Sequence, residues 1–450
     1  MSLRPFQLRR RFDESGFSLL EVMIALALGL LLSIGILSLF SSTSSTNKLQ
    51  DGLARLQENG RFAVSRMEKD FRMMGGQYCS NTAGGHTPGA SIPVMPARVP
   101  MSYAKRLTVG DQPGWPDMPD KNHKSFDANG NTDVNAATVA YPISSRWFIQ
   151  GYSGAGVPGG SALPEAALAD GKRVPGSDVL TIRYLRGSGW PLKAGIACTT
   201  GEDAPLSAGT VIQFETPVGD DPSSRMKMPA SGVEGLALIS DCISPAVIPI
   251  SNVAGNKVTV GDILSGATGS ICNTGGVRDT RIYNFSDDFV TVTYFLKFKK
   301  DENPGARANS AAGRLIPVLV RRENGEDQEL VRGVDQLAFR YGTLDDSGNI
   351  RFLLAEEIDA LGTSGCTQQP VGVGALENGC RWRSVRSIEA RLLVNTVDEV
   401  HGLDQSSRTF RFNGAESTLN DDDTLESGLK AGSQLRREFI AHISGRNLNL

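Results

Sequence analysis

The chain has 450 residues and a formal net charge of -3, so it lacks the strong positive field on which nucleic-acid binding usually depends. Its 50 glycines and 22 prolines indicate many loops, without the period of collagen or of a low-complexity sequence. The length allows one large or two medium domains, and we expect an irregular, β-rich fold.

The first predicted element is a membrane span at residues 17–40. The run from Phe17 to Phe40 carries a single formal charge, that of Glu21, and is long enough to cross a hydrocarbon core of roughly 30 Å as a helix. Arginines dominate the leader before it, so we expect the leader in the cytoplasm and the rest of the chain outside. A secretory signal peptide would have a shorter apolar region and a small-residue cleavage site, so the span is predicted to be retained.

The start of the span carries a recognisable signal. Gly16 precedes Phe17-Ser18-Leu19-Leu20-Glu21, with a basic leader before it and an apolar helix after it. This pattern resembles the class III signal of type IV prepilins and type II secretion pseudopilins. In that family a membrane aspartyl peptidase cuts after the glycine and N-methylates the new first residue. The resemblance implies cleavage after Gly16, methylation of Phe17 and a role for Glu21 in assembly.

The carboxylate of Glu21 needs a partner, because a charge inside a membrane is costly. After cleavage the amino group of Phe17 would be a cation, which Glu21 of a neighbouring subunit can meet. Two unit charges about 4 Å apart attract by roughly 4 kcal/mol at an effective dielectric constant of about 20, less the cost of desolvating both. The pairing would favour assembly. The alternative is that Glu21 sits at the headgroup level of an ordinary signal anchor.

A second, amphipathic helical stretch follows at residues 41–76. Its apolar side chains recur at helical spacings, and its charged side chains mostly lie between them. Gly75-Gly76 predicts the end of the helix, so we expect one nearly continuous helix from Phe17 to Met74 without a proline kink. Four glycines weaken it, each by about 1 kcal/mol relative to alanine. The apolar positions are Leu49, Leu53, Leu56, Ala63, Met67, Phe71 and Met74, and the glycines are Gly29, Gly35, Gly52 and Gly60.

All six cysteines follow the span, on the side where disulfides persist. Their spacing includes no C-x-x-C pair, so a zinc site is not expected. Sequence alone leaves 15 possible connectivities open, and we suggest Cys366 with Cys380 and Cys242 with Cys272. Free buried thiols are the alternative. The disulfide candidates are Cys79, Cys198, Cys242, Cys272, Cys366 and Cys380.

Residues 77–176 are rich in glycine, proline, asparagine and aspartate, and we expect a loop-rich insertion with short strands. Within it, residues 127–133 read DANGNTD, which approaches a calcium loop but lacks the glutamate at its last position. Asp421-Asp422-Asp423 with Glu426 gives a similar weak signal. Solvated turns explain both patterns, and we predict no metal and no cofactor.

Strands with alternating apolar residues begin near residue 177. They predict an antiparallel sheet that needs one apolar cover, which the long helix supplies. Pro317 indicates an edge or bulged strand for the fifth of them. The predicted strands centre on residues 180–184, 290–298, 337–341, 388–394, 315–320 and 410–412.

The amphipathic stretch and the strand order together resemble the PilW-type minor pilins. The residues that carry the resemblance are 56–63, LQENGRFA, and 70–76, DFRMMGG, before Cys79. The resemblance implies an α+β fold, in which a long N-terminal transmembrane and amphipathic helix packs on an antiparallel, β-rich, pilin-like head with long loops. The expected regions are a leader at 1–16, the transmembrane helix at 17–40, the amphipathic half at 41–76, the insertion at 77–176 and the ectodomain at 177–450.

Catalytic motifs are weak. Gly151-Tyr152-Ser153-Gly154-Ala155 approaches the G-x-S-x-G elbow but ends in alanine and lies in a glycine-rich loop, so an anchored hydrolase is only a distant alternative. We expect no enzyme. A basic group that could contact a partner or DNA is expected at solvated strand edges rather than on one face. Its members are Arg381, Arg383, Arg386 and Arg391.

The resemblance implies a minor pilin that prepilin peptidase processes and that helps to initiate a type IV pilus in a priming complex at the tip. Its expected partners are other minor and major pilins, prepilin peptidase, the inner membrane and a tip adhesin, with no nucleic acid by default. The head would lie in the periplasm and then at the pilus tip. The alternatives are a type II secretion pseudopilin, and a tip adhesin or DNA-uptake subunit that acts through residues 77–176.

Overall fold

The computed structural model describes most of the chain after the leader, with gaps in the long loops. The described ranges are 18–77, 80–81, 101–104, 140–143, 146, 148–154, 156, 163–193, 206–216, 226, 235–240, 245–264, 280–303, 307–344, 349–362, 380–400 and 408–445.

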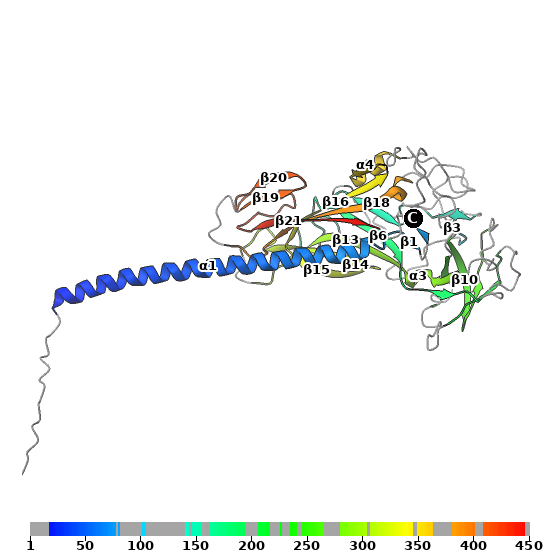
Figure 1. The fold of residues 1–450 in the computed structure, drawn as a ribbon, viewed down its shortest axis with the longest axis horizontal. Coiled ribbons are helices and arrows are strands. Elements are labelled where there is room, and N and C mark those ends of the chain that lie inside the picture. The colour runs from blue at the N-terminus through cyan, green and yellow to red at the C-terminus, as the bar shows by residue number, and fades with distance from the viewer. Residues whose placement is uncertain are drawn as a thin grey trace, which may run out of the picture.

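One long helix, α1 (Leu19–Phe71), dominates the N-terminal part and extends far beyond the head (Figure 1). Its N-cap is Ser18, whose hydroxyl accepts from the backbone N–H of Glu21 at 3.1 Å. After Phe71 the chain turns at Gly75, whose φ of 64° is the left-handed conformation that glycine adopts without strain. The predicted continuous helix is confirmed from Leu19 onward, and it ends three residues before the predicted Met74.

Two antiparallel sheets form the part of the head next to α1. The five-stranded sheet has the order β15-β14-β13-β6-β5, with β5 (Ile149–Tyr152), β6 (Val179–Leu185), β13 (Phe289–Lys300), β14 (Leu315–Glu323) and β15 (Glu326–Arg332). The four-stranded sheet has the order β17-β16-β18-β21, with β16 (Val334–Leu344), β17 (Ile350–Leu353), β18 (Val385–Asn395) and β21 (Arg436–Ser444).

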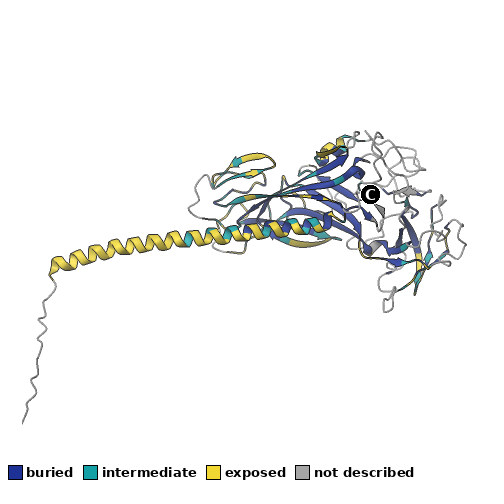
Figure 2. Ribbon diagram, viewed as in Figure 1, coloured by how far each residue is buried: buried dark blue, intermediate teal, exposed yellow. Residues whose placement is uncertain are grey.

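The main apolar core lies between these sheets and the C-terminal half of α1. Phe71 marks its centre, since its ring meets Tyr294 of β13 and Phe339 of β16 at centroid distances of 5.4 and 6.0 Å. Figure 2 shows the resulting change along α1, from fully exposed in the N-terminal half to partly buried against the sheets. The α+β architecture, with a long helix on an antiparallel β-rich head, is confirmed.

A third, eight-stranded sheet forms what we call the distal lobe, at the end of the head away from the free end of α1 (Figure 1). It has its own apolar core around Trp190 and Phe214. Its strands come from both sides of residue 177. They are β3 (Met101–Ser102), β4 (Tyr141–Pro142), β7 (Trp190–Pro191), β8 (Val211–Gln213), β9 (Gly235–Ser240), β10 (Ala246–Ala254), β11 (Lys257–Val260) and β12 (Arg281–Asn284).

The register shows how this lobe joins the head. Leu185 at the end of β6 pairs with Phe289 at the start of β13, so residues 186–288 leave and return on neighbouring strands. A further apolar cluster, which includes Leu185, Phe289 and Leu238 of β9, packs the lobe against the end of the five-stranded sheet. The lobe is therefore docked on the head by a packed interface.

The other described elements are short. They are β1 (Gly76–Gln77), β2 (Ser80–Asn81), β19 (Thr409–Phe412), β20 (Ala415–Thr418), the helices α3 (Phe285–Asp288) and α4 (Ala355–Ala360), and the 3-10 turn η4 (Cys380–Ser384).

All six predicted strands are present, as β6, β13, β16, β18, β14 and β19, and of the two alternatives predicted from Pro317 the strand is bulged and is not at an edge. β14 lies between β13 and β15, and its pairing with β15 shifts register between Leu319 and Val320, as in a bulge. The carbonyl of Pro317 accepts from the N–H of Gly333 at 2.8 Å. Since both polar groups of a strand residue point to the same side, the nitrogen of Pro317 faces away from β13 and no ladder bond to β13 is lost.

The predicted exposure of the arginine group is also wrong in part. Arg381 and Arg383 are buried in η4, where they donate to the backbone carbonyls of Leu344 at 3.2 Å and Ile143 at 2.9 Å. A buried guanidinium needs acceptors, and backbone carbonyls supply them here. These two arginines therefore contribute to the interior of the head.

Candidate functional site

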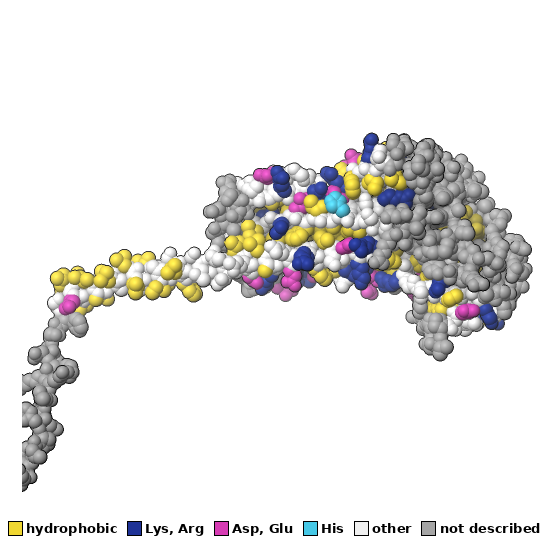
Figure 3. Space-filling view, viewed as in Figure 1, with side chains coloured by type: hydrophobic (Ala, Val, Ile, Leu, Met, Phe, Trp, Pro, Cys, Tyr) yellow, Lys and Arg dark blue, Asp and Glu magenta, His cyan; other side chains and the backbone are white. Residues whose placement is uncertain are grey.

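The apolar half of α1 stands apart from the head. Its large side chains are exposed throughout, from Leu19 at 80% to Phe40 at 73%. Figure 3 shows them along the part of the helix that extends away from the head. The most apolar stretch of 18 residues in α1 has a mean hydropathy of 2.6. Within the described part of the chain, α1 is the one helix long and apolar enough to cross a membrane. Lipid or other subunits must cover this surface, because exposing so large an apolar area to water is unfavourable in free energy.

Glu21 lies in the first turn of this exposed helix, and its side chain is exposed. The positive end of the helix dipole favours a carboxylate there. Among the described residues nothing pairs with that carboxylate, and Gly16 and Phe17, the predicted cleavage and methylation residues, lie outside the described residues.

Small residues follow Glu21 along one helical face. Ala25, Gly29 and Ser33 come at intervals of four, and they line a shallow groove together with Glu21. A Cβ added at Gly29 would meet nothing within 4 Å. The hydroxyl of Ser33 donates to the carbonyl of Gly29 at 2.8 Å, so it is satisfied within the helix. Such small faces let helices approach closely in a membrane.

The other half of α1 is attached to the head by an apolar stripe. Leu56, Ala63, Met67 and Phe71 are buried, and the helix contacts β21, β18 and β15. Gly60 belongs to the same stripe, and a Cβ at this position would come within 2.3 to 2.5 Å of the ring of Phe439 on β21. The absence of a side chain at Gly60 is therefore what lets the helix and strand meet.

A polar contact completes the attachment, and we call it the buried tetrad: Asp70, Tyr184, Tyr294 and Arg321. Asp70 is buried in the last turn of α1. Its Oδ2 accepts from Nε of Arg321 and from the hydroxyl of Tyr294, both at 2.6 Å. Its Oδ1 accepts from the hydroxyl of Tyr184 at 3.0 Å and from Nη2 of Arg321 at 3.2 Å. One helical carboxylate thus binds β6, β13 and β14.

The electrostatics of the tetrad follow from these bonds. Burial alone would raise the pKa of Asp70, but hydrogen bonds from Arg321 and Tyr294 and the charge of Arg321 outweigh it and lower the pKa. Burial and the charge of Asp70 raise the pKa of Tyr184 to about 12, and they raise that of Tyr294 further. Asp70 is therefore an anion, and both tyrosines are hydrogen-bond donors, at neutral pH.

The weak catalytic motif forms a different arrangement. Ser153 follows β5 and donates to Oε2 of Glu356 at 2.7 Å. Next to it, Asp178 accepts from the N–H groups of Gly154 at 3.2 Å and Phe339 at 2.9 Å. Burial raises the pKa of Asp178 to about 6, assisted by the charges of Glu356 and Glu426. Asp178 thus links the chain after β5 to β16 of the other sheet. The hydroxyl of Ser153 is bonded to Glu356, and among the described residues this does not form the Ser-His pair of a hydrolase elbow.

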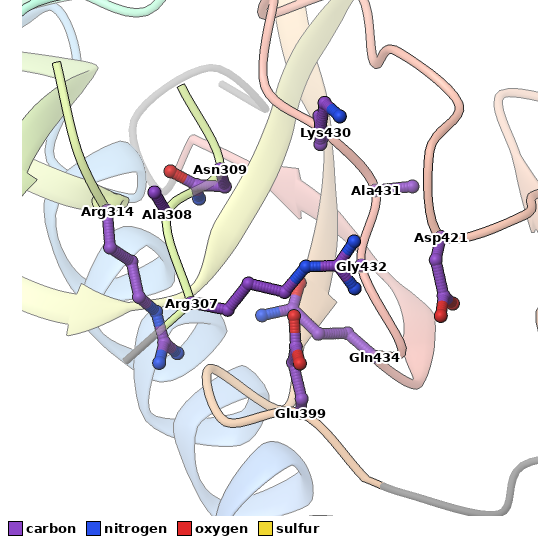
Figure 4. Close-up of a pocket in the computed structure, with 10 residues that line it drawn as sticks. All are labelled: Arg307, Ala308, Asn309, Arg314, Glu399, Asp421, Lys430, Ala431, Gly432 and Gln434. Atoms are coloured by element: carbon purple, nitrogen blue, oxygen red, sulfur yellow. The ribbon is translucent and has the colours of Figure 1, made fainter. Parts of the chain in front are cut away.

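The acidic turn at residues 421–423 is held by cations. Asp422 lies 3.2 Å from Lys430 and 3.5 Å from Arg307, and Asp421 lies 2.7 Å from Arg408. The turn borders a polar cavity of about 20 Å³, enough for a single water. Figure 4 shows Arg307 extending across it toward Gly432. Across the described residues, no three or more metal-ligating side chains gather into a site.

Several predicted residues cannot be placed. Residues 127–133 lie outside the described residues, as do Cys79, Cys198, Cys242, Cys272, Cys366 and the side chain of Cys380. The disulfide pairings therefore remain predictions.

Sequence reasoning missed the tetrad. Asp70 follows Met67 by three residues and directly precedes Phe71, so a charged side chain interrupts the apolar stripe of α1. That interruption was the available signal. Its partners lie 114 or more residues away in sequence, and no local pattern links them.

Comparison with known proteins gives two matches. Residues 306–447 match the PilW model, described as type IV pilus-assembly protein W, and residues 11–37 match the prokaryotic N-terminal methylation motif. The first match spans β14 to β21 and none of the distal lobe. No curated protein and no solved structure matches the chain.

Proposed function

We infer from the two family matches that the chain belongs to the PilW family and is a type IV minor pilin that takes part in pilus assembly. We propose that it acts in a priming complex at the pilus tip. The observation that carries this proposal is the two-part helix. One half of α1 is exposed and apolar, and the other half is fastened to a folded head.

In this proposal the leader 1–16 is removed after Gly16 and Phe17 becomes the methylated N-terminus. The remaining regions are the span at 17–40, the amphipathic half at 41–76, the insertion at 77–176 and the ectodomain at 177–450. The span anchors the subunit in the inner membrane, a location that the methylation-motif match supports, and the head lies in the periplasm until assembly carries it to the tip. The family and motif imply other pilins and prepilin peptidase as partners.

Glu21 supplies the assembly step. Its exposed carboxylate lies beside the groove of Ala25, Gly29 and Ser33, where the helix of another pilin can approach closely. Pairing with the amino group of that subunit removes an isolated charge from the membrane. The energetic gain arises only in the assembled state, so it drives the subunit into register.

Intact-mass and N-terminal analysis of protein from cells that carry the cognate peptidase tests the first step. The expected chain begins at N-methylated Phe17. A chain that still begins at Met1 would identify an ordinary signal anchor.

The second step is tested with Glu21→Gln and a matched control, Glu58→Gln, an exposed glutamate on the same helix beyond the span. We expect Glu21→Gln to be processed but to be lost from sheared pili, while Glu58→Gln assembles normally. Normal assembly of both variants would remove Glu21 from the mechanism.

The family match favours a type IV pilus over the type II secretion alternative, since its description names pilus assembly. The same membership indicates a structural role, and we propose no enzymatic activity.

A tip-binding role is the second candidate, and the position of the distal lobe supports it. The lobe lies at the end of the head away from the membrane helix (Figure 1), and the family match omits it. Replacing residues 186–288 by a two-residue turn between β6 and β13 removes strands β7 to β12 of the lobe and tests this role. Surviving piliation with lost surface binding would support it, and unchanged binding would contradict it.

A further inference from the structure

Two kinds of contact hold α1 to the head, and they differ in how much they constrain it. The apolar stripe of Leu56, Ala63 and Met67 buries surface, and burial has little directional preference. Buried hydrogen bonds weaken steeply when their geometry changes. The buried tetrad contributes four such bonds to one carboxylate.

We propose that Asp70 is the positioning residue of the assembly helix. Through the buried tetrad it sets the rotation and register of α1 against the five-stranded sheet, and so the direction in which the head faces neighbouring pilins. This inference rests on the proposed function for its biological meaning, but its structural content can be tested separately.

The location of Asp70 indicates that its main effect is to orient α1 rather than to increase the folding stability of the head. A carboxylate in the last turn of a helix is opposed by the helix dipole, and a buried ion pair is often no more stabilising than apolar side chains of similar volume. Its partners Arg321 and Tyr294 lie directly opposite each other on β14 and β13. The pairing of these two strands therefore fixes their positions. The tetrad thus adds little stability over an apolar contact of similar volume, but it defines a geometry.

A shift of α1 by one residue shows what the geometry excludes. It would rotate Asp70 by about 100° around the helix axis and move it by about 1.5 Å. So large a rotation would also turn the apolar stripe away from the sheets. A smaller rotation would leave the stripe buried, but it would misalign the directional bonds at 2.6 Å to Arg321 and Tyr294.

Because α1 is long, a small change in its tilt at the tetrad becomes a large displacement at its N-terminal end. From Asp70 back to Leu19 the helix extends by roughly 75 Å at its standard rise. A tilt of about 5° at the tetrad would displace the start of the helix by roughly 7 Å. That displacement exceeds the reach of an ion pair, so Glu21 would miss its partner.

The test measures the distance distribution between α1 and the head in the full-length protein in detergent. Spin labels on p-acetylphenylalanine at exposed Glu58 and exposed Lys257 leave the cysteines unmodified. In Asp70→Asn we expect the distribution to broaden and its mean to move. The matched control is Asp335→Asn, which removes the charge from another buried ion pair, Asp335 with Arg436 at 2.8 Å, between β16 and β21.

A positioning role requires that Asp70→Asn broadens the distribution while Asp335→Asn leaves it narrow, even though both variants lose stability. An unchanged distribution in Asp70→Asn, or equal broadening in both, would overturn the proposal. If Asp70→Asn does not fold, the double variant Tyr184→Phe and Tyr294→Phe retains the ion pair and removes two bonds. It should broaden the distribution in the same way, and a wild-type distribution would count against the proposal.

Glu21→Gln separates this inference from the proposed function. It should lose assembly and keep the wild-type distance distribution, whereas Asp70→Asn should lose assembly through a displaced helix. If wild-type protein proves not to be processed as a pilin, the proposed function fails while the distance measurement still decides the role of Asp70.

Discussion

Gly60 shows how a single residue sets the approach of helix and sheet. A glycine in a helix costs about 1 kcal/mol relative to alanine, and from sequence it is only a weak point. In the fold the ring of Phe439 occupies the space where a Cβ would be. The glycine is therefore required by packing.

We expect Gly60→Ala to lower the free energy of unfolding by about 1 to 3 kcal/mol, because overpacking outweighs the gain in helix propensity. Thermal and denaturant unfolding of the head measure the effect. Gly35→Ala is the control, since a Cβ there meets nothing within 4 Å. Equal stability of Gly60→Ala and wild type would show that Phe439 moves aside freely.

Asp178 gives the head a pH dependence. Its pKa is raised from 3.8 to about 6 in the folded state, chiefly by burial. The folded state therefore binds a proton that the unfolded state releases, and stability falls as pH rises from about 4 to about 6. A displacement of this size corresponds to at most roughly 3 kcal/mol.

Asp178→Asn should remove this decline, because an amide does not titrate. The measurement is the midpoint of urea unfolding at several pH values between 4 and 7. A decline of the same steepness in the variant would assign it to other groups. Asn can accept only one of the two N–H bonds, so we also expect the variant to be less stable at every pH, by about 1 to 3 kcal/mol.

Helix α1 behaves as two elements with one backbone. Its side chains are exposed up to Phe40 and exposed or half-buried over residues 41–55, and from Leu56 to Phe71 its apolar stripe belongs to the core of the head. Asp70 ends the second part. Since its pKa is lowered, its contribution to stability is present above the unfolded value of 3.8 and is lost as pH falls through the folded value.

Asp70→Asn should therefore lower the free energy of unfolding by about 1.5 to 3 kcal/mol at neutral pH, because Arg321 loses its buried partner and keeps only Glu323. Wild type and variant should converge in acid. Asp51→Asn is the helix control, as Asp51 and Arg55 form an exposed pair at 3.1 Å that contributes about 0 to 1 kcal/mol. Unfolding of all three proteins at pH 7 and pH 3 makes the comparison, and a parallel pH dependence would contradict the expectation.

At the scale of the whole molecule, we expect the membrane part and the head to unfold independently. The apolar window of α1 buries none of its surface in the head. Deleting residues 1–40 should yield a protein that stays in solution without detergent, with a head whose unfolding midpoint is unchanged. Calorimetry of the truncated and full-length proteins in the same detergent tests this, and a clearly lower midpoint for the truncated protein would show that the span supports the head.

The distal lobe contains strands that no local sequence pattern predicts. Strands β6, β13, β16 and β18 are predictable because apolar and polar residues alternate along them, although β6 and most of β13 are buried on both faces. Strands β9 and β10 escape prediction, since β9 is a short continuous apolar run that lacks that alternation. The pairing of β3 with β10, across more than one hundred residues, also has no local signal.

The sequence by itself determined the elements whose causes are local. The apolar run of the span, the position of Glu21 after Gly16, the helical stripe and the glycines at its end all follow from neighbouring residues. Only the tertiary structure decided what depends on distant partners. Asp70 finds Tyr184, Tyr294 and Arg321 on three strands, and Gly60 receives Phe439. Burial and directional hydrogen bonds between residues far apart in the chain are properties of the folded state, which no local pattern encodes.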